Sequence, residues 1–123
     1  MKRILVIEDE GIIRLNLLQI LNANGYEVIG AENGAVGLRL VREFIPNLII
    51  CNIKMPVLDG YEVFRELRSD AITAQISFIF LTAQMDLEQF SQEEQQTIRY
   101  LCKPFLSNEL LELISEIIGF QST

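Results

Sequence analysis

Histidine is absent from this chain of 123 residues. Its absence excludes Ser-His and Cys-His nucleophile systems and His-ligated metal sites, and the chain can carry no phosphohistidine of its own. Cysteine is scarce as well: Cys51 and Cys102 lie in apolar, strand-like runs and do not form a Cys-x-x-Cys spacing. We therefore expect both to be buried free thiols in a reducing cytosol rather than redox centres.

The chain also has few positively charged residues and no long apolar run. The chain has 10 Lys and Arg residues against 17 Asp and Glu residues, a net charge of −7, which argues against direct contact with nucleic acid. The apolar run that begins at Ile4 is cut at Glu8, too early for a signal peptide, and no stretch approaches the length of a membrane span. We expect a cytoplasmic protein that does not enter a membrane.

Apolar residues make up 50% of the chain, enough to form the core of one domain of this length. Short apolar runs alternate with helical patterns from end to end, as is typical of a parallel sheet covered by helices on both faces. The predicted strands are Arg3–Glu8, Glu27–Ala31, Asn47–Asn52, Ser77–Thr82 and Arg99–Lys103. The predicted helices are Gly11–Asn24, Ala35–Phe44, Tyr61–Ser69, Asp86–Gln96 and Ser107–Ile118.

Local signals mark several helix boundaries. Gly25 is expected just beyond the end of the first helix, Pro46 prevents the second from continuing, and Ser107 is expected to cap the last. The fourth helix has two candidate starts, because Ser91-Gln92-Glu93-Glu94 fits a capping box and favours a shorter helix than one beginning at Asp86.

Polar residues stand where the predicted strands end. Glu8 and Asp9 follow the first strand, Asn52 ends the third, Thr82 ends the fourth, and Lys103 ends the fifth. In a parallel sheet the carboxyl ends of the strands meet at one edge, so these side chains should converge there. Clustered oxygen ligands suit Mg²⁺, and a lysine with a threonine suits the oxygens of a phosphoryl group.

Four segments then carry a specific resemblance. Ile4–Glu10, Met55–Gly60, Phe80–Ala83 and Tyr100–Phe105 resemble, in order and spacing, the motifs of the receiver domain of bacterial two-component response regulators. The resemblance covers essentially the whole chain. It implies a flavodoxin-like (βα)5 three-layer sandwich with a parallel five-stranded sheet of order 2-1-3-4-5. We expect residues 1–123 to be a single receiver domain with no output domain in this chain.

The resemblance also implies roles for individual residues. Glu8 and Asp9 would hold Mg²⁺ together with the backbone carbonyl of Lys54 and the side chain at position 52. Thr82 and Lys103 would contact a phosphoryl group.

Two further residues have roles that only the resemblance suggests. Tyr100 would act with Thr82 as a switch, by swinging its ring inward. Asn52 occupies the position where the family has its phosphoaccepting aspartate, so the sequence departs from the family at the reacting atom itself.

An amide at the acceptor position changes the expected mechanism. Phosphotransfer needs a carboxylate oxygen as nucleophile, and an amide oxygen is uncharged and poorly nucleophilic. Mg²⁺ binding should weaken, with no cofactor required, and we expect Lys103 to pair with Glu8, Asp9 or the Asn52 carbonyl and hold the site closed. The chain is then interpreted as a pseudo-receiver, not an enzyme, that contacts a histidine kinase or other signalling protein without phosphorylation.

Two other interpretations stay open. The chain could be an ordinary phosphorylatable receiver in which Asn52 is an engineered replacement for aspartate, and an aspartate there would restore self-catalysed phosphotransfer. Other departures from the family pattern, at Gly11, Asn47 and Thr97-Ile98, favour natural drift instead. A flavin or nucleotide binder is disfavoured, because the chain lacks a Gly-rich phosphate loop and its first strand leads into acids.

The last helix carries more apolar residues than docking on a sheet requires. Leu110, Leu113, Ile114 and Ile117 form one stripe, and Leu111 and Ile118 widen it. A broad core face explains this pattern. The alternative is a partner surface formed by Leu111, Ile118 and Phe90, with a homodimer through the fourth helix, fifth strand and fifth helix left open.

Overall fold

The computed structural model describes residues 1–83 and 90–119, with the backbone alone for residues 96 and 97. Within these residues, five parallel strands form one sheet in the order β2-β1-β3-β4-β5, which confirms the predicted order. The strands are β1 (Arg3–Ile7), β2 (Glu27–Ala31), β3 (Leu48–Asn52), β4 (Ser77–Thr82) and β5 (Arg99–Cys102).

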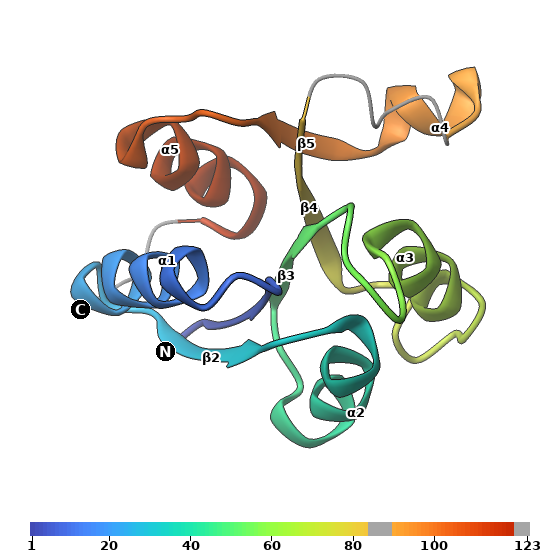
Figure 1. Cartoon of the computed structure of the whole chain (residues 1–123), viewed down its shortest axis with the longest axis horizontal. Coiled ribbons are helices and arrows are strands. Elements are labelled where there is room, and N and C mark those ends of the chain that lie inside the picture. The colour runs from blue at the N-terminus through green and yellow to red at the C-terminus, as the bar shows by residue number, and fades with distance from the viewer. Residues whose placement is uncertain (84–89, 120–123) are drawn as a thin grey trace.

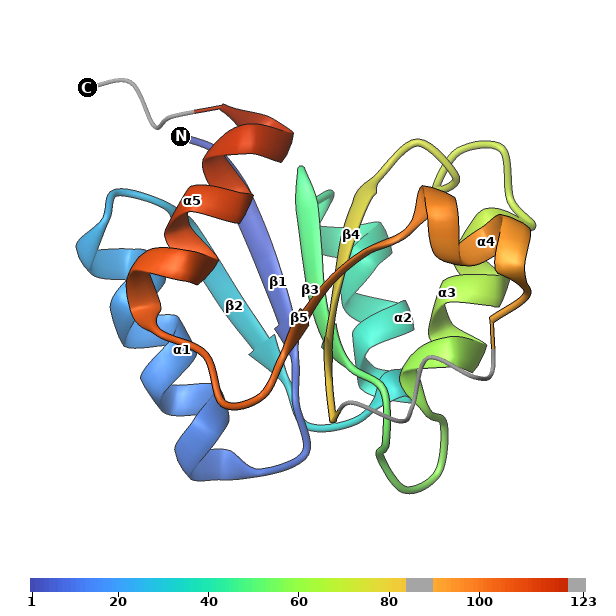
Figure 2. The ribbon, with the colours of Figure 1, turned by 90° about the horizontal axis from the view of Figure 1, so that it is seen from above.

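Helices cover both faces of this sheet. They are α1 (Gly11–Ala23), α2 (Gly34–Phe44), α3 (Gly60–Arg68), α4 (Gln92–Thr97) and α5 (Ser107–Ile118). Figures 1 and 2 show α1 and α5 on one side of the sheet and α2, α3 and α4 on the other. The result is the predicted three-layer flavodoxin-like arrangement. None of the described helices is long and apolar enough to cross a membrane.

The central strand β3 is buried along its whole length, which explains its continuous apolar sequence. Its residues alternate between the two faces. Ile49 and Cys51 join a core cluster with side chains from α2 and α3, whereas Leu48 and Ile50 join a second cluster with side chains from α1 and α5. The polar residue Asn52 therefore stands at the end of an otherwise apolar strand.

The predicted helix ends are confirmed for the first two helices. Gly25 follows the C-cap Asn24 of α1 with a φ of 89°, and Ile45, with a φ of 52°, ends α2 immediately before Pro46. The predicted range of the last helix, Ser107–Ile118, is confirmed, but the predicted cap was wrong, because Ser107 is the first helical residue. Leu106 takes the cap position, and its backbone N–H donates to the Glu109 carboxylate at 2.7 Å.

The fourth helix follows the shorter of the two predictions. Ser91 caps α4, and Ser91 and Glu94 form both hydrogen bonds of a capping box. The longer prediction, with a start at Asp86, falls on residues outside the described part of the chain.

Phe90 corrects the predicted partner surface. Its side chain is only 3% exposed, and its ring lies 5.0 Å from that of Tyr61 and 4.9 Å from that of Phe80. Phe90 therefore belongs to the core between α3 and the sheet. Leu111 and Ile118 are half-buried and pack against the second core cluster, so the broad core face explains them, and their role in a partner surface stays a prediction.

Candidate functional site

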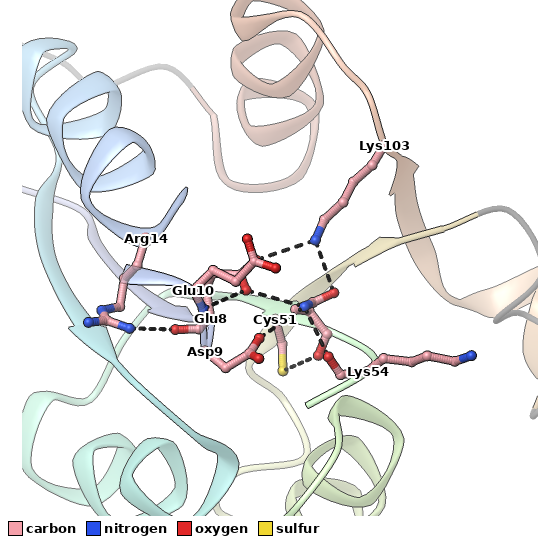
Figure 3. A network of polar contacts seen from close by, with 8 residues as sticks. Glu8, Asp9, Glu10, Arg14, Cys51, Lys54 and Lys103 are labelled. Carbon is pink, nitrogen blue, oxygen red and sulfur yellow. Dashed lines mark hydrogen bonds and ion pairs between the residues drawn. The ribbon is translucent and has the colours of Figure 1, made fainter. Parts of the chain in front are cut away.

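The polar strand ends converge as predicted. Glu8 directly follows β1, Asn52 ends β3, and Lys103 directly follows β5. Parallel pairing of β1 and β3 places the first two side by side, because Ile7 is in register with Cys51. Figure 3 shows Lys103 reaching from the end of β5 toward the acids that follow β1. Positions 95 residues apart in the chain thus meet at one edge of the sheet.

A tight turn supports the end of β3. The Gly60 N–H donates to the carbonyl of Ile53 at 2.7 Å, which brings the start of α3 under the strand. A Cβ at Gly60 would lie 2.4 Å from the Asn52 carbonyl oxygen, so the approach requires glycine. The neighbouring Lys54 turns its carbonyl toward the site, and its side chain points away (Figure 3).

The Asn52 amide nitrogen lies among three oxygens. It donates to Lys54 O at 3.1 Å, to Glu8 Oε2 at 3.2 Å and to Asp9 Oδ1 at 3.4 Å. The resemblance assigned these same three residues to a cation. An aspartate could not donate these hydrogen bonds, because an ionised carboxylate only accepts.

Lys103 completes the cluster from the opposite side. Its Nζ lies 3.4 Å from Glu8 Oε1 and 3.3 Å from Asn52 Oδ1. Lys103 was predicted to pair with Glu8, Asp9 or the Asn52 carbonyl, and its partners are Glu8 and the Asn52 side-chain carbonyl. The backbone N–H of Lys103 donates to the Thr82 carbonyl at 2.8 Å, which anchors the lysine beside the end of β4.

Glu8 is the most buried charge of the site, with no exposed surface. Burial raises its pKa above the ordinary value, and the hydrogen bond with Asp9 raises it further. The Glu10 backbone N–H, which donates to Glu8 Oε2 at 3.2 Å, and the Lys103 ammonium act in the opposite direction, but they are the smaller effects. The cluster therefore favours the neutral form of Glu8 more than water does.

Thr82 and Tyr100 lie at different distances from this network. Thr82 is buried at the same edge, and its hydroxyl donates to the Ala83 carbonyl at 2.6 Å. Tyr100, by contrast, is 42% exposed. The structure thus places Thr82 with the site and Tyr100 on the surface of β5, and their switch roles stay predictions.

Sequence reasoning missed Arg14, whose guanidinium Nη1 donates to the Glu8 carbonyl at 2.7 Å (Figure 3). The predicted site residues all came from strand ends, whereas Arg14 lies in the first turn of α1. A usable signal was present, since Arg14 is the one charged residue in the sequence of that helix. The expectation of free thiols holds, although only Cys51 is fully buried and Cys102 is half-buried.

A substitution at Glu8 should reveal the cost of its charge. In the folded chain its pKa is raised, so the folded state binds this proton more tightly than the unfolded state does, and stability falls as pH rises from the ordinary glutamate range through the folded pKa. We expect the free energy of unfolding of the parent, relative to that of Glu8→Gln, to be lower at pH 7 than at pH 4.5 by about 1 kcal/mol, because only the parent carries a titrating carboxyl group at this position. A glutamine side chain also sets an N–H group against Lys103 or Asn52, but this cost is present at both pH values.

Urea unfolding in EDTA at both pH values measures the difference. The matched control is Glu112→Gln, because Glu112 is exposed on α5, and this variant should stay within about 0.5 kcal/mol of the parent at both pH values. A difference in stability between Glu8→Gln and the parent that is the same at pH 4.5 and pH 7 would contradict the expectation.

Comparison with known proteins gives a consistent result. The sequence profile of the response regulator receiver domain matches residues 4–115. The chain is 32% identical over 120 residues to protein PilH of Pseudomonas aeruginosa, covering 97% of this chain and 99% of PilH. Several other curated relatives are longer, and the chain spans about half the length of each.

Solved structures agree with the sequence relatives. A response regulator receiver domain protein from Clostridium thermocellum superposes with a TM-score of 0.86 at 32% identity, over 97% of this chain and 95% of that one. The receiver domain of sensor histidine kinase PA1611 from Pseudomonas aeruginosa, described with a magnesium ion coordinated in its active site cleft, superposes with a TM-score of 0.82 at 30% identity, over 96% of this chain and 98% of that one.

Proposed function

The chain belongs to the family of response regulator receiver domains, which serve in two-component signalling, and from that membership we propose that it is a pseudo-receiver. In this proposal Asn52 takes the acceptor position, and the domain signals by protein–protein contact that is independent of phosphorylation. The observation that carries the proposal is the amide at the end of β3, bonded on one side to Lys103 and on the other to the acids that follow β1.

The chemistry of the amide supports this proposal. Phosphotransfer from a phosphohistidine requires an electron-rich oxygen that can form an acyl phosphate. The Asn52 oxygen is uncharged and accepts a hydrogen bond from Lys103, while the nitrogen end is turned toward the acids. No acyl phosphate should therefore accumulate at this position, and the domain is proposed to have no enzymatic activity of its own.

A divalent cation does not fit the cluster as it is arranged. The donor set of two carboxylates and one carbonyl has the hard oxygens that Mg²⁺ prefers. The N–H group of Asn52, however, already points at all of these oxygens. Among the described residues, no group of three or more His, Cys, Asp and Glu side chains is placed to hold a metal. We propose that signalling by this domain requires no cofactor.

The partner of the proposed pseudo-receiver is another protein. Receiver domains interact with histidine kinases and other signalling proteins. For this chain we propose such a partner, with no direct nucleic-acid contact, because the net charge is −7. A surface formed by α4, β5 and α5, with Leu111 and Ile118 at its border, is the proposed contact, and a homodimer through the same surface stays open.

Phosphorylation with a small donor tests the proposal. We expect no phosphoryl adduct in the intact mass of the native chain after incubation with acetyl phosphate and Mg²⁺. An adduct that forms after Asn52→Asp would show that Thr82 and Lys103 are competent and that the amide alone blocks the chemistry.

The matched control is Asn22→Asp, which adds the same charge in the last turn of α1 and should stay unmodified. A stable adduct on the native chain would defeat the pseudo-receiver and leave an ordinary receiver in its place.

A further inference from the structure

The Asn52 carboxamide is held at both of its ends. Its nitrogen faces three oxygens at 3.1 to 3.4 Å, from Lys54, Glu8 and Asp9. Its oxygen faces the Lys103 ammonium at 3.3 Å. The side chain is 9% exposed, so water can replace few of these contacts. The amide nitrogen donates only to oxygens, and the amide oxygen accepts from the ammonium group. The surroundings therefore fix the orientation of the amide.

The nitrogen end of the amide does what a cation would do at the same place. It brings positive partial charge and two N–H donors to oxygens that would otherwise repel one another. Two carboxylates about 4 Å apart repel by roughly 4 kcal/mol at an effective dielectric near 20. We propose that the Asn52 carboxamide is a built-in replacement for the divalent cation, so that this chain closes the site without metal and excludes Mg²⁺ from it.

The directions of the Asn52 hydrogen bonds explain why Mg²⁺ would be excluded from the site. Mg²⁺ requires oxygen ligands at about 2.0–2.1 Å in near-octahedral geometry, which leaves no room for an N–H donor among the same oxygens. Turning the amide over would present its oxygen to the cation, but it would also place the two N–H groups against the Lys103 ammonium. Donor would then face donor, and the hydrogen bonds of both ends would be lost.

An amide that occupies the place of the cation has a different effect from a position that only lacks a charged ligand. If position 52 merely lacked a ligand, removing its side chain would leave cation binding as weak as before or weaken it further. If the amide occupies the cation's place, removing it should improve binding even though no new ligand is supplied. The proposal rests on the proposed function only in taking this edge of the sheet as the site.

Calorimetric titration with MgCl₂ separates these two cases. We expect Mg²⁺ affinity to rise in the order native, Asn52→Ala, Asn52→Asp, with the last on the order of 100-fold tighter than the native chain. The Asn22→Asp control should bind as the native chain does. Thermal unfolding in rising MgCl₂, against NaCl of equal ionic strength, gives a second readout: a saturable increase in midpoint for the two Asn52 variants and none for the native chain.

A native chain that binds Mg²⁺ as tightly as Asn52→Ala would overturn the proposal. The Asn52→Ala variant adds no charge, so the ordering against the native chain can be read even if Asn52→Asp does not fold. Failure here is distinct from failure of the proposed function. A phosphoryl adduct on the native chain would end the pseudo-receiver whatever the order of Mg²⁺ affinities, whereas tight Mg²⁺ binding without an adduct would end only the cation replacement.

Discussion

Asn52→Asp is expected to lower the free energy of unfolding of the metal-free protein by about 2 kcal/mol at pH 7. The substitution removes the N–H donors that satisfy Glu8, Asp9 and the Lys54 carbonyl. It also introduces a third carboxylate where two acids already lie close together. Attraction to Lys103 offsets part of this repulsion, but one ammonium that is 29% exposed cannot neutralise three acids.

Urea unfolding in EDTA measures this loss, and the pH dependence identifies its cause. Repulsion among carboxylates should fade as they are protonated, so the difference between the variant and the parent should shrink toward pH 4. The control Asn22→Asp, with the same added charge on exposed helix surface, should change stability by about 0.5 kcal/mol or less. Equal losses for the two variants would mean that the local network contributes nothing.

This expected cost bears on why an amide occupies the site. Acids that lie close together repel one another unless a cation or a hydrogen-bond donor lies between them. In this chain the amide relieves that repulsion and links β1, β3 and the segment after β5 through hydrogen bonds. The amide therefore stabilises the closed arrangement, which is what the proposed contact independent of phosphorylation would require.

The parts of the fold that follow from periodicity could be predicted from the sequence. Short apolar runs separated by helical patterns predict parallel strands with right-handed crossovers and helices on both faces. The strand order was implied by the family resemblance and not by periodicity. The meeting of Glu8, Asn52 and Lys103 followed from the same rule, since the carboxyl ends of parallel strands share an edge. Opposite charges among those residues were then sufficient to predict the pairing of Lys103.

Features that depend on side-chain packing could not be predicted in this way. Ser107 has the right chemistry for a cap, but Leu106 takes the cap position, where its N–H donates to the Glu109 carboxylate. Tyr100 lies on the edge strand β5, where the sequence does not say which face is covered. Arg14 contacts a backbone carbonyl, and such contacts leave no periodic signal.

Phe90 was assigned to a partner surface for a related reason. It lies in the range first predicted for the fourth helix, Asp86–Gln96, which was one of the elements of the predicted partner surface. Its actual neighbours come from distant parts of the sequence. Phe64 of α3 and Phe80 of β4 form an aromatic cluster with it, and Arg65 of α3 makes an ion pair with Glu94 of α4 that holds the two helices together.

Phe90→Ala is accordingly expected to destabilise the protein by about 3 kcal/mol, as for other large buried aromatics. The ring packs at centroid distances of 4.9 to 6.0 Å against Phe80, Tyr61 and Phe64, so its removal leaves a cavity under α4. Denaturant unfolding gives the free energy, and Tyr100→Ala is the matched aromatic control. Because Tyr100 is 42% exposed, its loss should be under about 1 kcal/mol.

The comparison also decides between the two roles considered for Phe90. If Phe90 were a surface residue, Phe90→Ala would weaken partner binding with little change in the free energy of unfolding. If it is a core residue, the substitution should lower the free energy of unfolding and affect binding only through the docking of α4. Equal stability of Phe90→Ala and Tyr100→Ala would restore the surface assignment. The expected difference instead assigns the Phe90 ring to holding α4 against α3, so that the exposed side of this helix, with Gln92 and Glu93, is what a partner would meet.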